Sequence, residues 1–572
     1  MDILTVDDFS LELRRDTEWK QILHHVSFSL GKGETVGIVG ESGSGKSVTA
    51  LSVMQLLNRK IAKFTSGSLV FHDKDKEVNL IEASEQQMKS IRGAKIAMIF
   101  QEPMTSLNPV IKCGEQVTEA ILLHSKCTKK EARDQVIELF KEVLLPRPEK
   151  IFDSYPHELS GGQKQRVMIA MAMSCHPDIL IADEPTTALD VTVQKNILEL
   201  MRSLQQKYGM SIIFITHDLG VVAEIAERVI VLYKGQIVET GLVRDIFKNP
   251  QHPYTRGLLA CRPPLDVRLK KLSTVDDFMR NTNDHQESLT VEVVTAEERQ
   301  AFHQQLYADK PLISIAHLYK TYPIRKRKLF EKQEYVHAVQ DICLEVYEGE
   351  TLGLVGESGC GKTTLGRSMI RLIEPTSGMV SYKGVNLLQL SGREMMKLRK
   401  DLQIILQDPY SSLNQRITIG SAIMEPMQVH RLYANDKERK KKAIELLERV
   451  NLDESHFYRY PHEFSGGQRQ RISIARALAV NPRFIICDES VSALDVSVQA
   501  QVLNLLNDLK KEYHLTYIFI SHDLSVVKFM SDRMAVMQNG RIVELNDADV
   551  IYAHPQTEYT NKLIGAIPKG IS

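Results

Sequence analysis

TVGIVGESGSGKSVTA, residues 35–50, is a short β-branched run followed by a glycine-rich loop and the start of a helical pattern. The loop, from Gly40 to Ser47, fits the pattern G-x-x-x-x-G-K-[ST]. Glycines allow such a loop to wrap around a phosphate, so that successive backbone N–H groups point at its oxygens. The N-terminus of the following helix favours the same anion. The stretch therefore predicts a strand, a phosphate-binding loop and a helix.

The pattern occurs a second time, as TLGLVGESGCGKTTLG at 351–366, and the chain repeats far more than this loop. YPHELSGGQKQR at 155–166 returns as YPHEFSGGQRQR at 460–471, and ILIADEPTTALDVTVQ at 179–194 returns as FIICDESVSALDVSVQ at 484–499. The repeat predicts two copies of one domain, residues 1–260 and 311–572. The polar segment between them, 261–310, is expected to be a linker with one short helix over 296–307.

Short apolar runs such as TVGIV, DILIAD and SIIFIT alternate with helical stretches in each half. Uniformly apolar strands between helices are typical of a parallel sheet that is buried on both faces. The fold class predicted from this pattern is α/β.

Charged residues follow these strands at matching places in the two halves. Asp183 and Asp488 end apolar strands, where a carboxylate can hold Mg²⁺ at the edge of the sheet. Elsewhere such an Asp is usually only a strand end, but its recurrence after two phosphate loops favours a functional role. The same argument gives these expected roles: Lys46 and Lys362 on the β- and γ-phosphates, Ser47 and Thr363 as Mg²⁺ ligands, Glu184 and Glu489 as groups that orient or deprotonate the attacking water, and His217 and His522 as γ-phosphate contacts.

Composition excludes several other classes of protein. Lys+Arg and Asp+Glu are both 72, so the formal net charge is zero and does not support nucleic-acid binding. The basic run IRKRKLF at 324–330 is interpreted as a solvated loop. The seven cysteines are scattered, which predicts neither disulfides nor a metal or iron–sulfur cluster. The acidic N-terminus is not a signal peptide, and no apolar run approaches the ~18–20 residues of a membrane span, so other chains must do any spanning.

The order of motifs in each half resembles the ATPase domain of the ATP-binding-cassette (ABC) family: phosphate loop, Gln101 or Gln407, LSGGQ or FSGGQ, the Asp-Glu pair, ALD and His. The resemblance implies two tandem P-loop NTPase domains, each with a RecA-like, mostly parallel sheet core, an antiparallel β subdomain and a helical signature subdomain. It also implies ATP and Mg²⁺ as cofactors.

In this family two cassettes meet head to tail, so the resemblance implies that each signature completes the site begun in the other half. Each signature serine is also expected to cap a helix, whose free N–H groups could donate to the γ-phosphate. The residues implied to bind nucleotide are Gly40, Ser42, Gly43, Gly45, Lys46 and Ser47 with Ser465, Gly466, Gly467 and Gln468, and Gly356, Ser358, Gly359, Gly361, Lys362 and Thr363 with Ser160, Gly161, Gly162 and Gln163. The implied catalytic residues are Glu184, Glu489, His217, His522, Gln101 and Gln407, and the implied metal ligands are Ser47, Gln101, Asp183, Thr363, Gln407 and Asp488.

Departures from the family pattern are few. Phe464 replaces the usual Leu, and Ser490 stands where the first half has Pro185. Both Glu and both His are present, so two hydrolytically competent sites are predicted. The aromatic platform for adenine is assigned to Tyr322 in the second half. The matching position in the first half is Leu13, and the nearby Trp19 is the weaker alternative.

Two functions fit a twin cassette: the energising subunit of a membrane transporter, or a soluble ATPase such as a translation factor or DNA-repair protein. QEPMTSLNP, QDPYSSLNQ, YPHE and HPYTRGLL resemble the dipeptide/oligopeptide branch of bacterial importers. The short spacing from each Gln to its signature leaves little room for a translation factor's inserted arm, and zinc-binding cysteine clusters are missing. The resemblance implies a peripheral protein at the cytoplasmic face of the inner membrane, with two permease subunits and an external substrate-binding protein as partners. The substrate stays open.

Overall fold

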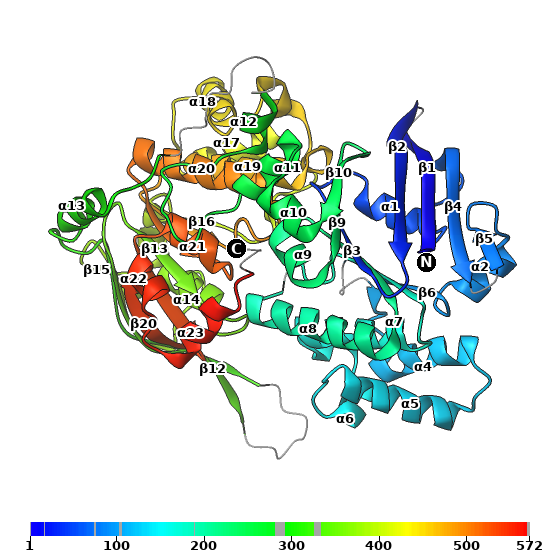
Figure 1. Cartoon of the computed structure of the whole chain (residues 1–572). Helices are drawn as coiled ribbons and strands as arrows, with labels where there is room; N and C mark the ends of the chain where they lie inside the picture. The colour runs from blue at the N-terminus through cyan, green and yellow to red at the C-terminus, as the bar shows by residue number, and fades with distance from the viewer. Residues whose placement is uncertain are drawn as a thin grey trace.

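The structure is a computed structural model that describes residues 2–15, 18–73, 76–101, 106–187, 189–280, 292–324 and 333–568. Two halves with the same order of elements lie side by side (Figure 1). They meet near α8 (Val191–Tyr208) of the first half and α23 (Glu558–Gly565) of the second, where the Lys195 ammonium donates to the Gly565 carbonyl at 3.2 Å.

Each half is built on a six-stranded sheet. Five of its strands are parallel, and the edge strand that comes last along the chain, β10 or β20, is antiparallel. In the first half the order is β10-β9-β3-β8-β7-β6, and in the second it is β20-β19-β13-β18-β17-β16. The bounds are β3 Thr35–Val39, β6 Ile96–Ile99, β7 Ile179–Asp183, β8 Ser211–Thr216, β9 Arg228–Tyr233 and β10 Gln236–Leu242, then β13 Thr351–Val355, β16 Leu402–Ile405, β17 Phe484–Asp488, β18 Thr516–Ile520, β19 Arg533–Gln538 and β20 Arg541–Asp547. These sheets confirm the predicted α/β class.

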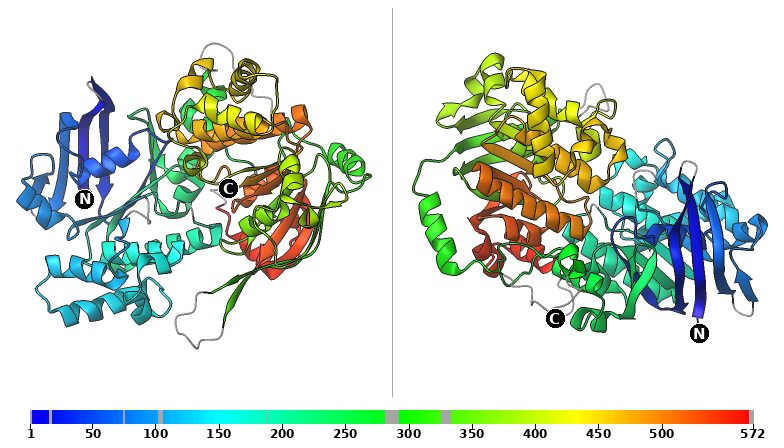
Figure 2. Two further views of the ribbon diagram at one scale, coloured as in Figure 1. Left: turned by 180° about the vertical axis from the view of Figure 1, so that it is seen from behind. Right: turned by 90° about the horizontal axis from the view of Figure 1, so that it is seen from above.

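A four-stranded antiparallel sheet flanks each core, as the family resemblance implied. Its orders are β2-β1-β4-β5 and β12-β11-β14-β15. Figure 2 shows the first of these sheets, in blue, at the outer side of its half. The bounds are β1 Asp2–Arg15, β2 Glu18–Gly31, β4 Ala62–Asp73 and β5 Lys76–Asn79, then β11 Ile313–Pro323, β12 Tyr335–Val346, β14 Ser377–Tyr382 and β15 Val385–Asn386.

Helices follow the strands in matching order in the two halves. The first half has α1 Lys46–Val53, α2 Glu85–Ile91, α4 Cys113–His124, α5 Lys129–Glu142, α6 Pro148–Phe152, α7 Gly161–Met173, α8, α9 Leu219–Ile225, α10 Val243–Lys248 and α11 Pro253–Ala260. The second has α14 Lys362–Met369, α15 Gly392–Leu398, α16 Pro409–Ser412, α17 Ile419–Val429, α18 Asp436–Arg449, α19 Gly466–Leu478, α20 Val496–Tyr513, α21 Leu524–Met530, α22 Ala548–Ala553 and α23. The helical subdomains consist of α4–α7 and α17–α19.

Alternate residues of each core strand enter different apolar clusters. On β7, Ile179 and Ile181 pack in the cluster of the antiparallel sheet, whereas Leu180 and Ala182 pack in a second cluster with the signature helix. Successive side chains of a strand point to opposite faces, so the parallel sheet is covered on both sides. The second cluster also contains the matching residues of the other half, so one apolar core continues across the two halves.

The segment 261–310 contains the predicted helix, α13 (Ala296–Leu306), and one that was not predicted, α12 (Val275–Arg280). It also packs on the second half more closely than a polar linker suggests. The Leu272 backbone N–H donates to Asn504 Oδ1 at 2.9 Å, and Asn504 Nδ2 donates to the Leu272 carbonyl at 2.8 Å, both in buried surroundings.

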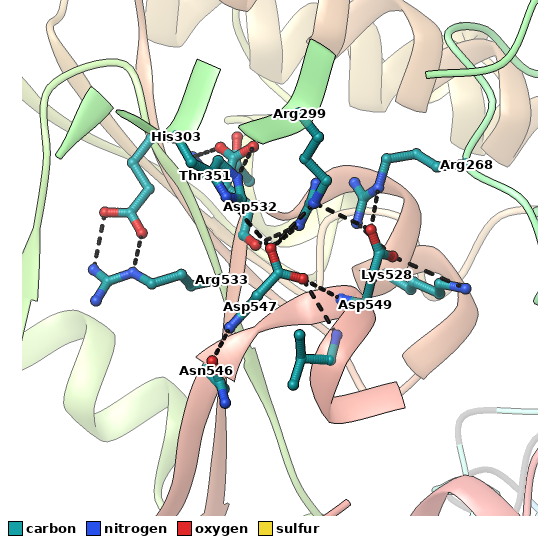
Figure 3. Close-up of polar contacts among 12 residues, drawn as sticks. Arg268, Arg299, His303, Thr351, Lys528, Asp532, Arg533, Asn546, Asp547 and Asp549 are labelled. Carbon is teal, nitrogen blue, oxygen red and sulfur yellow. Dashed lines mark hydrogen bonds and ion pairs between the residues drawn. The ribbon is translucent and has the colours of Figure 1, made fainter. Parts of the chain in front are cut away.

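Two arginines fix this segment to the second half (Figure 3). Arg268 Nη2 lies 3.1 Å from Asp549 Oδ1, and Arg299 Nη2 lies 2.9 Å from Asp547 Oδ2. Arg299 also donates to the Asp532 carbonyl at 2.7 Å. We call Arg268, Arg299 and their carboxylate partners Asp547 and Asp549 the linker clamp.

Replacing Arg299 with alanine should lower the free energy of unfolding by about 2 kcal/mol near pH 7, because it leaves the partly buried Asp547 without its arginine and Asp549 without one of its two arginines. Burial opposes ionisation of Asp549, but Arg268 and Arg299 outweigh it and lower its pKa. A carboxylate whose pKa is lowered on folding stabilises the folded state at pH values above its unfolded-state pKa. This stabilisation is lost as the pH falls through the folded-state pKa. The loss should therefore shrink below about pH 4. Urea unfolding at several pH values measures it, with the exposed Arg244→Ala as control; equal losses in both variants would refute the clamp.

Candidate functional site

Each phosphate loop lies between a buried strand and a helix, as predicted. In the first half it joins β3 to α1, and in the second it joins β13 to α14. A Cβ atom at Gly40 would lie 2.2 Å from the Leu232 carbonyl oxygen, and one at Gly361 would lie 2.0 Å from the Ala338 carbonyl oxygen. Both positions also have positive φ. Only glycine fits there, so the close approach to a neighbouring strand explains these two glycines.

The loop lysines are turned back onto their own loops. Lys46 Nζ donates to the Gly40 carbonyl at 2.7 Å, and Lys362 Nζ donates to the Gly356 carbonyl at 2.7 Å. Burial lowers the pKa of Lys46, although Glu184 and Asp495 oppose this. Both ammonium groups therefore lie inside the loops where a phosphate would bind.

The hydroxyl that follows each lysine contacts the carboxylate at the end of a core strand. Ser47 Oγ donates to Asp183 Oδ1 at 3.1 Å, and Thr363 Oγ1 donates to Asp488 Oδ1 at 2.8 Å. Burial raises the pKa of Asp183 to about 6 and also raises that of Asp488. A hydroxyl and a buried carboxylate offer the hard oxygen ligands that Mg²⁺ prefers, so these pairs fit the expected metal.

Next to Asp183, the Glu184 carboxylate is held by three side chains. Gln101 Nε2 donates to Glu184 Oε2 at 3.1 Å, Thr187 Oγ1 donates to the same oxygen at 3.0 Å, and His217 Nδ1 lies 3.4 Å from Oε1. Burial opposes ionisation, but His217 and Lys46 outweigh it and lower the pKa of Glu184 to about 2. The predicted glutamine, glutamate and histidine of the first site are therefore brought together around one charged carboxylate.

The second site repeats this arrangement. Gln407 Nε2 donates to Glu489 Oε2 at 2.6 Å, and His522 Nδ1 lies 3.8 Å from the same oxygen. The pKa of Glu489 is lowered, because His522 and Lys362 outweigh the effect of burial. Glu184 and Glu489 both have a φ of +48°, a conformation uncommon outside glycine that clusters at functional sites. The shared backbone conformation supports equivalent roles.

The signature serines cap helices, as expected. Gln163 N donates to Ser160 Oγ, and Gln468 N donates to Ser465 Oγ, each at 3.3 Å. Ser160 and Ser465 are exposed. A Cβ at Gly467 would lie 2.3 Å from a Val498 methyl group, so that glycine also lets the signature helix approach its neighbour α20. Helix capping and close packing account for these residues locally, and the exposed helix ends remain open to a ligand.

Contacts cross between the phosphate loop of each half and the ALD segment of the other. The Ser42 backbone N–H donates to Asp495 Oδ2 at 3.0 Å, and Ser497 Oγ donates to Glu41. In the opposite direction, Thr192 Oγ1 donates to Glu357 Oε1 at 2.9 Å. The phosphate loop of each half is therefore contacted by the ALD segment of the other half.

Asp190 and Asp495 each contact the phosphate loop of the other half and were not predicted individually. Burial raises the pKa of Asp190, while a hydrogen bond with the Ser358 backbone and the charge of Lys362 oppose this. Their only signal in the sequence is the repeated ALDVTVQ/ALDVSVQ. His217 and His522 also line one cavity of about 100 Å³ between the halves.

The strand register relates the two positions predicted to contact adenine. Tyr322 pairs with Val336 on β12, and Leu13 pairs with Lys20 on β2, at matching places in the two antiparallel sheets. Tyr322 is 36% exposed and Trp19 is 43% exposed. Aromatic surface is thus available in both halves, although Trp19 belongs to the next pair along the strands, opposite Arg14.

Two phosphate loops, each with its own Asp-Glu pair and each contacted by the other half, define a twin-cassette P-loop nucleotide-binding protein. The chain belongs to the ABC transporter family, whose model matches residues 23–187 and 339–492. A second model, described as oligopeptide/dipeptide transporter, C-terminal region, matches 238–287.

Curated relatives match over nearly the whole chain. The glutathione import ATP-binding protein GsiA of Escherichia coli (strain K12) is 48% identical over 570 residues, which covers 99% of this chain and 89% of the relative. GsiA of Salmonella typhimurium is 47% identical over 573 residues, with 99% and 90% covered. Among solved structures, a dimeric post-hydrolysis ATP-binding cassette bound to ADP and Pi is 29% identical, with a TM-score of 0.38, and covers 41% of this chain and 98% of that one.

Every helix in the described part of the chain is too short or too polar to cross a membrane.

Proposed function

We propose that this chain is the ATP-hydrolysing subunit of a bacterial importer for dipeptides, oligopeptides or related small solutes. Two observations together carry the proposal. The phosphate loop of each cassette is contacted by the other cassette, and residues 238–287 match the C-terminal region of oligopeptide/dipeptide transporters. The names of the relatives add glutathione to the candidate substrates. A soluble translation or repair ATPase is not favoured, because both family models and the relatives named above are described as transporter proteins.

In this proposal each ATP binds between the phosphate loop of one half and the signature of the other. Water attacks the γ-phosphorus, the bond between it and the β–γ bridging oxygen breaks, and ADP and phosphate form. Mg²⁺ held by Ser47 and Asp183, or by Thr363 and Asp488, would neutralise phosphate charge. Glu184 or Glu489, charged at neutral pH, orients the water and accepts its proton, while the neighbouring Gln and His hold the carboxylate.

In this proposal the signature residues make closure of the two halves depend on bound ATP. Ser465 and Gly467 begin the helix α19, directly beside the ALD segment that contacts the first phosphate loop. N–H groups at the start of a helix attract an anion, so a γ-phosphate would gain contacts only when the halves are closed. Hydrolysis removes that bridging group and lets the halves part.

The segment after each Gln is proposed to grip two permease subunits. Glu102–Thr105 in the first half lie outside the described residues, whereas 408–412 in the second half are described. There Tyr410 is 52% exposed with its ring 5.2 Å from the Arg469 guanidinium on the signature helix. A side chain that is both exposed and packed on the signature helix could pass motion between permease and ATP site.

Affinity purification of the tagged chain from gently solubilised cells, followed by mass spectrometry, tests the proposal. Recovery of two polytopic membrane proteins would support a transporter at the cytoplasmic face of the membrane, and an external binding protein encoded or recovered with them would indicate the substrate. Recovery of ribosomal or DNA-repair proteins without permeases would refute the importer and leave only the ATPase.

A further inference from the structure

The two metal positions differ by one charged side chain. Arg367 lies on α14, one helical turn after Thr363, and its Nη2 is 3.4 Å from Asp488 Oδ2. The matching residue of the first half, one turn after Ser47, is Leu51. Among the described side chains, the Asp183 carboxylate therefore has only the Ser47 hydroxyl at hydrogen-bond distance. Asp488 has a hydroxyl on one oxygen and a guanidinium on the other.

The guanidinium is placed where it opposes a second cation. Asp488 is 1% exposed, so its carboxylate is poorly screened by water. Among the described atoms, Arg367 Nε is buried without a hydrogen-bond partner, so the side chain is held by Asp488 rather than by a network of its own. A divalent ion bound by Thr363 and Asp488 would share that carboxylate with the positive charge of Arg367.

We propose that Arg367 is a positioning residue that makes the two sites unequal: the second site holds its divalent ion less tightly than the first. This inference rests on the proposed metal ligands and goes beyond them, because their residue types alone predict equal sites. Since the Arg367 side chain is 39% exposed, solvent reduces the repulsion, and we expect affinities that differ by roughly tenfold.

Binding of Mn²⁺ to the full chain tests the proposal without any turnover. The chain would carry Glu184→Gln and Glu489→Gln, be loaded with ATP without metal, and be freed of unbound nucleotide by gel filtration. Electron paramagnetic resonance then measures free Mn²⁺ during a titration. Two classes of site are expected, with dissociation constants that differ by roughly tenfold.

Reciprocal exchange of the two residues identifies the cause. Arg367→Leu should convert the weaker class into the tighter one, Leu51→Arg should do the reverse, and Arg367→Lys should keep the weaker class because it keeps the charge. Thermal midpoints and metal-free ATP binding check that each variant is folded. If Arg367→Leu binds ATP but the weaker class persists, the inference is overturned.

Two further outcomes separate this inference from the proposed function. A single class of two sites with equal Mn²⁺ affinity in the parent chain would overturn the role of Arg367 but would leave the metal-ligand assignment intact. An ATP-loaded chain that binds no Mn²⁺ would overturn the assignment of Ser47, Asp183, Thr363 and Asp488, and the inference with it.

Discussion

Steady-state ATP hydrolysis should fall by roughly a hundredfold or more when either Glu184 or Glu489 is replaced by glutamine. The amide keeps the shape of the side chain but cannot accept the proton of the attacking water. Glu184 is buried and Glu489 is mostly buried, and both are charged and held by a Gln and a His in the same way. Because closing the two halves involves both sites, one missing base is expected to stop the cycle for both. Release of phosphate from ATP measures the loss.

The exposed Glu199→Gln on α8 is the control for loss of a carboxylate, and its activity should equal that of the parent chain. If one of the two site variants retained full activity, the prediction of two hydrolytically competent sites would be wrong. A Glu184→Gln chain that binds no ATP would show instead that the side chain supports the nucleotide rather than the water.

Retained ATP should reveal which signature completes which site. In a chain with Glu184→Gln and Glu489→Gln, adding Lys46→Ala and Ser465→Arg should leave one tightly held ATP, because both changes fall in the same proposed site. Adding Lys46→Ala and Ser160→Arg should leave none, because one change falls in each. The loss should exceed tenfold at each disabled site, since an arginine at the helix start blocks the phosphate position. Filter retention of labelled ATP counts the bound nucleotide.

The two double changes serve as controls for each other, since they share Lys46→Ala and each adds an exposed serine-to-arginine exchange. The opposite result, one ATP kept with Ser160→Arg and none with Ser465→Arg, would mean that each signature serves its own half. That outcome would contradict the head-to-tail assignment in spite of the Ser42–Asp495 contact.

The core sheet and both phosphate loops were predictable because each depends on local rules. The four residues 179–182 of β7 are buried and need only be apolar. Gly40 must be a glycine because a side chain there would collide with the Leu232 carbonyl oxygen. Repetition made these signals stronger, since Asp183 and Glu184 would otherwise be read as an ordinary strand end. The catalytic cluster could be assembled because every member follows a strand of the same sheet.

Long-range polar partners were not predictable. Arg268 and Arg299 look like any charged residues of a polar linker. Their partners Asp549 and Asp547 lie 281 and 248 residues further along the chain, respectively. No periodicity reports such a pair. The contrast between Leu51 and Arg367 was visible in the aligned repeats, but its meaning depends on the position of Asp488 in space.

The linker clamp also limits how far the halves can travel. The first half ends in α11 at Ala260, and Arg268 is already fixed to the second half, so residues 261–267 form the connecting segment. A connecting segment this short keeps the effective concentration of one cassette near the other at or above the millimolar range. The two halves must then open by a hinge motion about this segment rather than by full separation, and exchange of cassettes between chains is suppressed. In the proposed importer, a single polypeptide would place one of each cassette beneath each pair of permease subunits.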